Sequence, residues 1–305
     1  MPDLAFFTRH PLLKRLLMPA VAVIAFGLFL MLTFPYDALA RRIEAEARRT
    51  GAEVSIGRLG PAGLFGVRGR DVKVRFAPAP GEATGLEIRL DRADVNPDLF
   101  ALILRRTSFG FSAEGYGGTA RGHVSVSSDP RLPGLKSLRI DARDIDLATL
   151  PLKDLAGIEA SGKLQVKADL PALLPVETAN GSVSLALDGG GVGGTLMGMT
   201  LPKTSLGHVD GSATVEKGVA HVEKTSARGG DIDADVDGSC NLRPLLSLSQ
   251  ADLHVRFRLA SAWLDRNQMI KGMIGLLPPT ARQGDGSYAF TFTGPLAHMT
   301  SRPGR

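Results

Sequence analysis

After Gly51, apolar and polar residues alternate along the chain in short segments, several of which begin at a glycine. Each of these has the glycine, then a short polar residue, then apolar residues at every second position. The pattern occurs at Gly162, Gly181, Gly211, Gly230 and Gly286, and in a looser form at Gly118. Such alternation over four to eight residues indicates β-strands with one apolar and one polar face.

Other segments alternate in the same way without the leading glycine. They cover residues 53–58, 71–76, 86–90, 107–113, 136–142, 219–226 and 252–259. Turn residues separate the segments at short intervals, so neighbouring strands are expected to pair antiparallel through hairpins. The predicted fold class is mainly β: one large, curved, mostly antiparallel sheet with two short helices.

The first predicted helix in this part of the chain covers residues 96–104. Asn96 is a suitable N-cap, and Pro97 would occupy the first helical position. After Asp98 its sequence, NPDLFALIL, is apolar.

The second predicted helix runs from Ser261 to Leu277 and stops before two prolines. One stripe along it carries large apolar side chains, namely Trp263, Ile270, Ile274 and Leu277. We expect this stripe to pack against the apolar face of the sheet, as a helix that fills a groove.

Such a sheet poses a problem of coverage. Apolar surface left in water forgoes about 25 cal/mol of stabilising free energy per Å². An exposed apolar face on a dozen strands would therefore be strongly unfavourable. The sheet either curls over its own face or forms a groove that a helix, a lipid or a partner fills.

An uncharged apolar run, LLMPAVAVIAFGLFLMLTF, precedes the alternating segments. It meets the requirement of about 20 residues for a helix that crosses a bilayer. The side chains predicted to anchor the chain in lipid are Leu16, Leu17, Val21, Ile24, Phe26, Leu28, Phe29, Leu30, Leu32 and Phe34. A cleaved signal peptide is the alternative, because Ala38-Leu39-Ala40 has the form of a cleavage site. The run is longer than a signal peptide needs, which favours the uncleaved anchor.

The basic residues nearest the apolar run set its predicted orientation. Lys14 and Arg15 adjoin the run, whereas Arg41 follows at a distance, which favours a cytoplasmic N-terminus. The predicted organisation is a cytoplasmic tail (1–15), a transmembrane helix (16–35), a juxtamembrane helix (36–50) and a periplasmic β-rich domain (51–305). This is the layout of a single-pass membrane protein.

Composition adds limits to this picture. The chain has 36 glycines and 19 prolines, and aromatic residues make up only 6% of it, which suits many turns and small side chains. The net charge is +5, but the basic residues are scattered, so a nucleic-acid partner is not expected. The single cysteine, Cys240, excludes an intrachain disulfide.

Two short motifs suggest ligand binding but have simpler explanations. The glycines from Gly189 to Gly194 fit the G-x-G-x-x-G pattern, yet no helix is predicted after them to meet a pyrophosphate, so a flexible hairpin loop is favoured. Asp233, Asp235 and Asp237 resemble the start of a calcium loop, but Pro244 stands where a bidentate Glu is needed. Alternation with apolar residues explains these acids as the polar side of a strand.

No catalytic pattern is recognisable in the sequence. The six histidines lack the spacing of metal ligands, Cys240 has no C-x-x-C partner, and neither G-x-S-x-G nor a Walker A loop occurs. The prediction is a protein that is not an enzyme, with no catalytic, cofactor or metal residues and no cofactor.

The order of segments resembles the type II secretion system protein N family (GspN), in its form of about 300 residues. The resemblance rests on the anchor that closes on PYDALARRIEAEA after Phe34, on PAGLFGVRGRDVKVRF after Gly60, and on NPDLFALIL after Val95. It continues in GFSAEGYGGTARGHV after Phe109 and in the closing SYAFTFTGPLAHMTSRPG after Gly286. In that tail the proline of the family's ending is displaced.

The resemblance implies a non-enzymatic inner-membrane component of the type II protein secretion system, with a periplasmic β domain like that of AsmA-like proteins, whose sheets form an apolar groove or open barrel. The implied partners are other secretion subunits in the inner membrane and periplasm, together with membrane lipid. The alternative is an AsmA-like protein of lipid handling or outer-membrane biogenesis, whose groove holds acyl chains.

Overall fold

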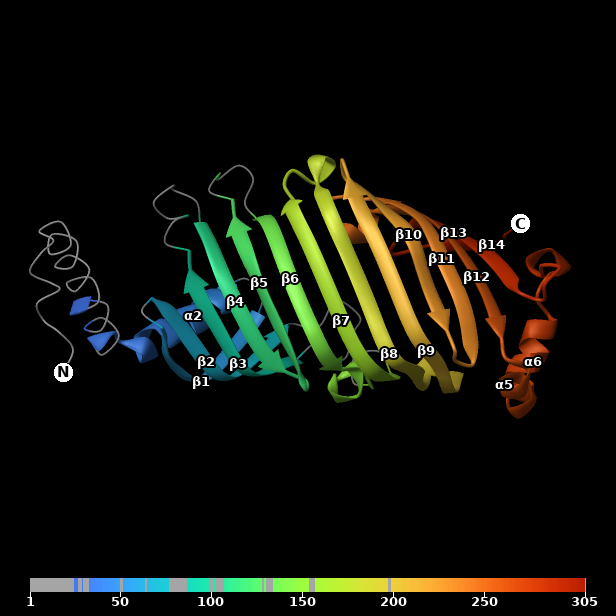
Figure 1. Ribbon diagram of the computed structural model, residues 1–305, viewed down its shortest axis with the longest axis horizontal. Coiled ribbons are helices and arrows are strands. Elements are labelled where there is room, and N and C mark those ends of the chain that lie inside the picture. Colours follow the sequence, from blue (N-terminus) through green and yellow to red (C-terminus); the bar gives the residue numbers. More distant parts are fainter. Residues whose placement is uncertain are drawn as a thin grey trace, which may run out of the picture.

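The computed structural model describes most of the chain after residue 33. The described residues are 25–26, 29, 33–49, 52–63, 65–76, 87–98, 101, 107–127, 129, 134–153, 157–196 and 199–304. They form one open antiparallel sheet of 14 strands, in which every strand pairs with its neighbours in the sequence (Figure 1). The predicted mainly β class and the antiparallel pairing are confirmed.

The strands follow the chain in spatial order. They are β1 Ala52–Ala62, β2 Gly66–Phe76, β3 Glu87–Pro97, β4 Thr107–Gly115, β5 Gly118–Val126, β6 Leu135–Asp146, β7 Ile158–Ala172, β8 Asn180–Leu196, β9 Met199–Glu216, β10 Val219–Arg228, β11 Ile232–Asn241, β12 Gln250–Leu259, β13 Tyr288–Pro295 and β14 Thr300–Pro303. Because β1 and β14 are the two edges and do not pair with each other, the sheet is not closed into a barrel.

Helix α2, Tyr36–Arg49, lies beside the first edge of the sheet (Figure 1). It corresponds to the helix predicted over residues 36–50. Its Glu44 Oε1 accepts a hydrogen bond of 3.2 Å from the backbone N of Ile56 in β1. The helix thus occupies a donor of an edge strand that would otherwise be open to pairing with another chain.

The connections between strands lie along two rims of the sheet. The upper rim in Figure 1 carries the short 3-10 helices η3, Val176–Thr178, and η4, Leu246–Leu248. The lower rim carries η2, Leu147–Thr149, and the helices α5, Ser261–Arg266, and α6, Gln268–Gly275, while η5, Pro279–Ala281, precedes β13.

The helix predicted over residues 96–104 is wrong at its start. Asn96 and Pro97 belong to β3, where they pair with Gly110 and Phe109. Asp98 takes the capping role instead, because its Oδ1 accepts a hydrogen bond of 3.1 Å from the backbone N of Ala101. Proline is common at the first position of a helix, but here the pairing of β3 with β4 outweighs this preference of Pro97.

The helix predicted from Ser261 to Leu277 is two helices. Asn267 separates α5 from α6 with φ −121° and ψ 67°, outside the helical region. Its side-chain Nδ2 donates to the backbone O of Trp263 at 2.8 Å. Asparagine competes with the helical backbone through such local hydrogen bonds, which explains the break.

The flexible hairpin loop predicted at Gly189–Gly194 is also wrong. These glycines lie inside β8, where Gly191 pairs with Ser161 of β7 and with Ser205 of β9. A bulge beside Gly189 and Gly190 shifts the register there. Glycine is found at bulges because it accepts unusual backbone angles, and Gly189 has φ +64°.

The predicted transmembrane segment lies mostly outside the described residues, although Phe26, Phe29 and Phe34 fall within them. Among the helices that the structure describes, none combines the length and the hydropathy required to cross a membrane.

One residue of the sheet, Gly122 in β5, leaves no room for a side chain. A Cβ added there would lie 2.1 Å from the backbone O of Arg139 and 2.8 Å from the ring of Phe111, which covers the glycine from β4. A Cβ added at Gly60 in β1 would meet nothing within 4 Å.

We therefore expect Gly122→Ala to lower the free energy of unfolding by about 1 to 3 kcal/mol, because the backbone contact must be relieved. Gly60→Ala is the matched control and should change stability by less than about 0.5 kcal/mol. Thermal and urea unfolding of the purified chain measure both values. Equal stability of the two variants would contradict the close approach of β5 and β6.

Candidate functional site

One face of the sheet is apolar from the first strand to the last. A single transverse row of directly paired residues crosses all 14 strands. We call it the apolar row: Pro61, Val67, Val95, Phe111, Gly122, Ile140, Ala168, Val183, Ala213, Val222, Gly238, Leu253, Phe292 and Ser301. Only the last member, in the short edge strand β14, is polar.

Strands β3 to β14 carry a second row of paired residues, which is polar except for one glycine, Gly110. We call it the polar row: Asn96, Gly110, His123, Arg139, Asp169, Ser182, Thr214, His221, Ser239, Asp252, Thr293 and Thr300. Its members stand one residue from the apolar row on each strand, so they point to the opposite face. The sheet therefore has an apolar face and a polar face along its whole length.

The apolar face extends well beyond this one row. On β7 it includes Leu164, Val166, Ala168 and Leu170, which are every second residue and span about 20 Å along the strand. With 14 strands about 4.8 Å apart, the row itself is about 60 Å long. The apolar face thus measures on the order of 1,000 Å², against about 300 to 600 Å² for the largest apolar patch of a typical monomer.

The large side chains of the apolar face are only partly shielded. Val95 is 39% exposed and Leu185 is 37% exposed, and the other aliphatic members of the apolar row are half-buried. The buried apolar residues of the described sheet are mostly alanines, such as Ala142 and Ala251. Within the described residues all strands belong to this one sheet, so no second layer of strands covers this face.

The apolar face ends in a group of aromatic rings near β13. Phe257 of β12 stacks on Tyr288 and Phe290 of β13, with ring centroids 5.7 Å and 6.1 Å apart. Leu253 pairs with Phe292 beside them. Four aromatic residues, Phe257, Tyr288, Phe290 and Phe292, therefore gather at the C-terminal end of the face.

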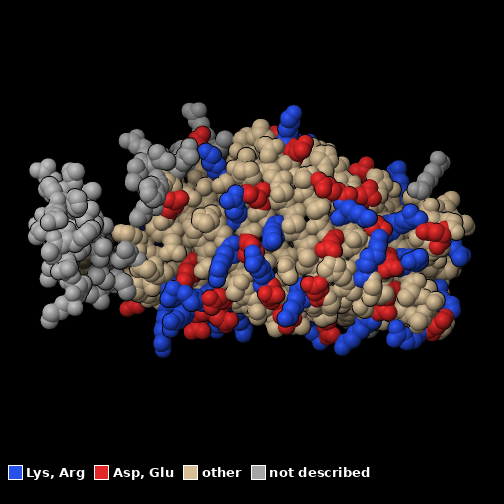
Figure 2. Space-filling model, viewed as in Figure 1, with Lys and Arg blue, Asp and Glu red and all other residues tan. Residues whose placement is uncertain are grey.

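On the face seen in Figure 2, basic and acidic side chains are interspersed, mainly over its middle and lower part. Asp94 of β3 receives two hydrogen bonds from Arg68, of 2.8 and 2.9 Å, and two from Arg92, of 3.2 and 2.9 Å. The hydrogen bonds from Arg68, and then those from Arg92, hold the pKa of the Asp94 carboxyl well below its usual range. In the same way, Arg75 and then Arg89 lower the pKa of Glu87 to about 2.

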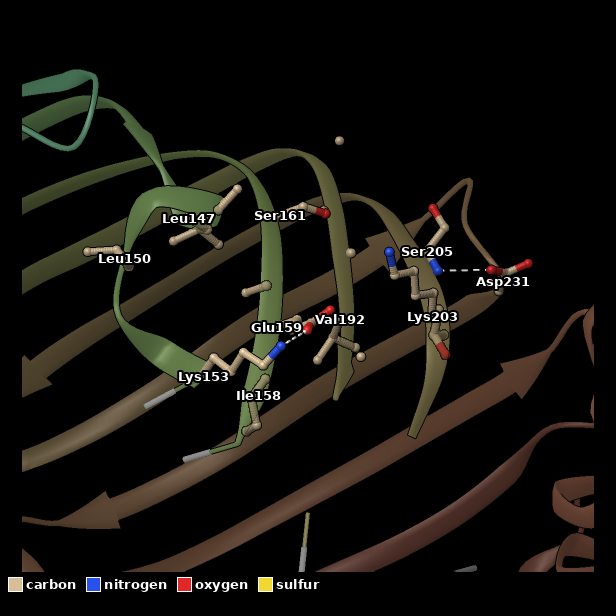
Figure 3. Close-up of a pocket in the computed structure, with 17 residues that line it drawn as sticks. Leu147, Leu150, Lys153, Ile158, Glu159, Ser161, Val192, Lys203, Ser205 and Asp231 are labelled. Atoms are coloured by element: carbon tan, nitrogen blue, oxygen red, sulfur yellow. Dashed lines mark hydrogen bonds and ion pairs between the residues drawn. The ribbon is translucent and has the colours of Figure 1, made fainter. Parts of the chain in front are cut away.

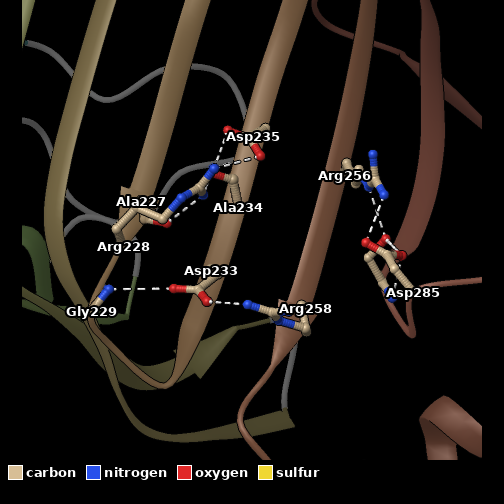
Figure 4. A network of polar contacts seen from close by, with 10 residues as sticks. Ala227, Arg228, Gly229, Asp233, Ala234, Asp235, Arg256, Arg258 and Asp285 are labelled. Carbon is tan, nitrogen blue, oxygen red and sulfur yellow. Dashed lines mark hydrogen bonds and ion pairs between the residues drawn. The ribbon is translucent and has the colours of Figure 1, made fainter. Parts of the chain in front are cut away.

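The acids that resemble a calcium loop belong to this polar face (Figure 4). Asp235 lies 2.5 Å from Arg228 of β10, and Asp233 lies 3.1 Å from Arg258 of β12. Both are in β11, as the strand interpretation predicted. Among the described residues, no cluster of His, Cys, Asp and Glu side chains has an arrangement that could hold a metal ion.

His208 of β9 lies between two carboxylates of this face, a feature that the sequence did not reveal. Its Nδ1 is 2.6 Å from Asp188 Oδ1 and its Nε2 is 2.6 Å from Asp210 Oδ2. The hydrogen bond to Asp188, followed by the charge of Asp210, raises the pKa of the imidazole. Asp188 comes from the next strand through the bulge in β8, which no local sequence pattern predicts.

A pocket of about 670 Å³ lies at the lower rim, where the segment after η2 faces β7, β8 and β9 (Figure 3). The glycines of β8 form one wall, and Leu147, Leu150, Ile158 and Val192 supply apolar surface. Its four charged residues are two lysines and two acids. The charges of these four side chains cancel.

Three of these side chains, those of Lys153, Glu159 and Asp231, make polar contacts at the wall of the pocket. Lys153 Nζ lies 2.7 Å from Glu159 Oε1, and this hydrogen bond lowers the pKa of Glu159. Asp231 Oδ2 accepts a hydrogen bond of 2.8 Å from the backbone N of Ser205. The apolar face, with its greater extent, is the stronger candidate for the functional site.

The residues predicted for a groove-packing helix are divided between α5, which holds Trp263, and α6, which holds Ile270 and Ile274, while Leu277 lies just beyond α6. Trp263 is buried, with 4% exposure, whereas Ile270, Ile274 and Leu277 are half-buried. The indole Nε1 of Trp263 has no hydrogen-bond partner among the described residues. Figure 1 shows both helices at the lower rim near the C-terminal strands. Their packing against the apolar face stays a prediction.

Comparison with models of protein families, with curated protein sequences and with solved structures finds no match to this chain. The class that the fold itself defines is an open, single-layer antiparallel sheet with opposite polar and apolar faces. The resemblance to the type II secretion system protein N family stays a prediction that rests on the order of sequence segments.

The contacts of Asp94 predict a dependence of stability on pH. Because the folded pKa is depressed, the stabilisation is fully present above the ordinary aspartate pKa of about 3.9 and is lost as the pH falls through the folded value. Asp94→Asn should lower the free energy of unfolding by about 1 to 3 kcal/mol at neutral pH. It should also reduce the loss of stability below pH 4.

Urea unfolding at neutral and acid pH measures both effects. Asp91→Asn, at an exposed position three residues earlier on β3, is the matched control and should behave like the unaltered chain. The same acid sensitivity in Asp94→Asn and the unaltered chain would show that another carboxylate is responsible.

Proposed function

We propose that the apolar face binds the acyl chains of membrane lipids, and that the protein is a non-enzymatic lipid-handling component of the bacterial envelope. The observation that carries the proposal is the apolar row, which crosses the whole sheet while its large side chains remain only half-buried. A surface of this size is costly in water and needs an apolar occupant.

Acyl chains fit this surface better than a folded protein does. Protein interfaces have about one hydrogen bond per 100 to 200 Å² and depend on Trp, Tyr and Arg anchors. The apolar row has neither a charged side chain nor any Trp or Tyr, and only Ser301 at its end has a side-chain donor. A hydrocarbon chain requires no hydrogen bonds, so it can lie anywhere along the row without leaving a polar group unpaired.

The location of the protein in this proposal follows from the sequence. The predicted span at residues 16–35 would anchor the chain in the inner membrane, with residues 51–305 in the periplasm, and bring the sheet close to a source of lipid. The proposal assigns the chain no cofactor and no catalytic residue.

A role in type II protein secretion is the second candidate, and the edge strand β14 favours it. All four residues of β14 are exposed, and the strand pairs on one side only, with β13. An exposed edge can accept a strand from another envelope subunit. The two candidates are compatible, because a partner at the edge leaves the apolar face free.

The test is the lipid content of the full chain purified in mild detergent, measured by mass spectrometry after extraction. Leu185→Asp places a charge on the apolar face at a residue that is 37% exposed, so the fold should tolerate it. Its matched control, Ser184→Asp, places the same charge on the adjacent polar side of β8.

We expect the unaltered chain and Ser184→Asp to retain phospholipid, and Leu185→Asp to retain several-fold less, since burying a charge against a hydrocarbon chain is unfavourable. Thermal unfolding verifies that all three are folded. Equal lipid in both variants would refute acyl-chain binding by this face.

A further inference from the structure

The pocket at the lower rim lies where the apolar face meets charged side chains. Ile158 and Ala160 continue the alternation of β7 that includes Leu164. Val192 of β8 pairs with Ala160, so it belongs to the same apolar side. Glu159 stands between Ile158 and Ala160 and points to the opposite side. The pocket therefore joins the end of the apolar face to polar groups at the ends of the strands.

A phospholipid bound as in the proposed function needs such a junction, and the present inference rests on that function. The acyl chains would lie on the apolar face, but a charged head group placed there would lose its hydrogen bonds to water. The head group must therefore lie at a rim of the sheet. The pocket has a volume of about 670 Å³, within the range of roughly 300 to 1,000 Å³ that is usual for small-molecule sites.

The charged side chains are arranged in a line across the pocket. Figure 3 shows the ion pair of Lys153 and Glu159 at one side, Val192 in the middle, and Lys203 followed by Asp231 at the other side. Glu159 belongs to β7 and Lys203 to β9, so two strand spacings, about 10 Å, separate their backbones. The glycines of β8 lie between these strands and leave room for a ligand. Lys203 therefore has an acid on each side.

Lys203 and Asp231 are both able to contact a ligand. Lys203 is exposed and makes no hydrogen bond or ion pair within the described part of the chain. Asp231 Oδ2 accepts a hydrogen bond of 2.8 Å from the backbone N of Ser205, and its Oδ1 lies 3.4 Å from Arg266. Arg266 is 70% exposed and does not line the pocket. Because so exposed a pair is weak, Oδ1 can still accept a hydrogen bond from a ligand.

We propose that this pocket binds the zwitterionic head group of a phospholipid with a primary ammonium, such as phosphatidylethanolamine. The phosphate lies at Lys203 and the ammonium donates to Asp231, which gives each charge of the head group a charge-assisted hydrogen bond. The acyl chains leave the pocket past Ile158 and Val192 and continue on the apolar face. Phosphatidylglycerol has the same phosphate, but it offers Asp231 only neutral hydroxyls, which form weaker hydrogen bonds.

Competition between these two lipids tests the proposal. The full chain in mild detergent is equilibrated with equal amounts of phosphatidylethanolamine and phosphatidylglycerol that have identical acyl chains. It is then purified again, and the retained lipids are quantified by mass spectrometry. We expect the unaltered chain to retain about fivefold more phosphatidylethanolamine than phosphatidylglycerol, as one partly exposed ion pair allows.

Asp231→Asn removes the partner of the ammonium and should bring the two lipids to about equal amounts. Its matched control is Asp233→Asn, two residues later, where the carboxylate also pairs with an exposed arginine, Arg258, but does not line the pocket. This control should keep the preference of the unaltered chain.

Lys203→Gln removes the partner of the phosphate, which both lipids share, and should reduce the retention of both. Because Lys203 is exposed and has no ion pair within the described residues, this variant should fold even if Asp231→Asn does not. Lys163→Gln, at an exposed position of β7 outside the pocket, is its control and should retain both lipids normally. Thermal unfolding verifies that each variant is folded.

Equal retention of the two lipids by the unaltered chain, an undiminished preference in Asp231→Asn, or normal retention by Lys203→Gln would each overturn the proposal. Leu185→Asp separates such a failure from a failure of the proposed function. If the unaltered chain shows no preference while Leu185→Asp retains several-fold less of both lipids, the head-group site is wrong and acyl-chain binding stands. If Leu185→Asp retains normal lipid with the preference intact, the head-group site stands and acyl-chain binding by the apolar face is wrong.

Discussion

The structure depends on keeping the apolar–polar alternation of each strand aligned with that of its neighbours across all 14 strands. Each strand alternates apolar and polar residues, and each hairpin must align its strand so that apolar residues face apolar residues. A slip of one residue at any hairpin would turn an entire strand over. Bulges correct the phase where the sequence itself breaks alternation. In β6, Asp144 with φ +57° is the extra residue that returns Ile145 to the apolar face opposite Leu164.

A sheet built in this way obtains its stability differently from a two-layered domain. Its buried apolar residues are mainly alanines, and its larger side chains contact each other only across neighbouring strands. On the opposite face, paired charges such as Asp94 of β3 with Arg68 of β2 connect adjacent strands. An apolar occupant would therefore add a hydrophobic contribution that the chain lacks on its own, and lipid binding and stability should be linked.

Much of this architecture could be predicted from the sequence, because a period of two is a local signal. The strands around Val183, Val222 and Leu253 and their antiparallel pairing follow directly from it. The errors arose where tertiary pairing overrides local preference. Pro97 is typical of a helix start but pairs with β4 as part of β3. The glycines after Gly189 are typical of a loop but extend β8. Asn267 interrupts a helix that the apolar stripe predicts as continuous.

The existence of an apolar face could be predicted from the sequence, but the residues that form the candidate site could not. Alternation shows that one face must be apolar, but the transverse apolar row depends on the register of all 14 strands, which no single segment determines. The ion pairs of Asp94 and the position of His208 between two carboxylates depend on the same register.

Photo-crosslinking of lipid in living cells tests the central claim most directly. A benzophenone amino acid replaces Val183 on the apolar row or its neighbour Ser182 on the polar row, and the irradiated protein is analysed by intact mass. Acyl-chain binding predicts phospholipid adducts at position 183 and none at position 182. Equal adducts at both positions, or only protein adducts at position 183, would contradict it.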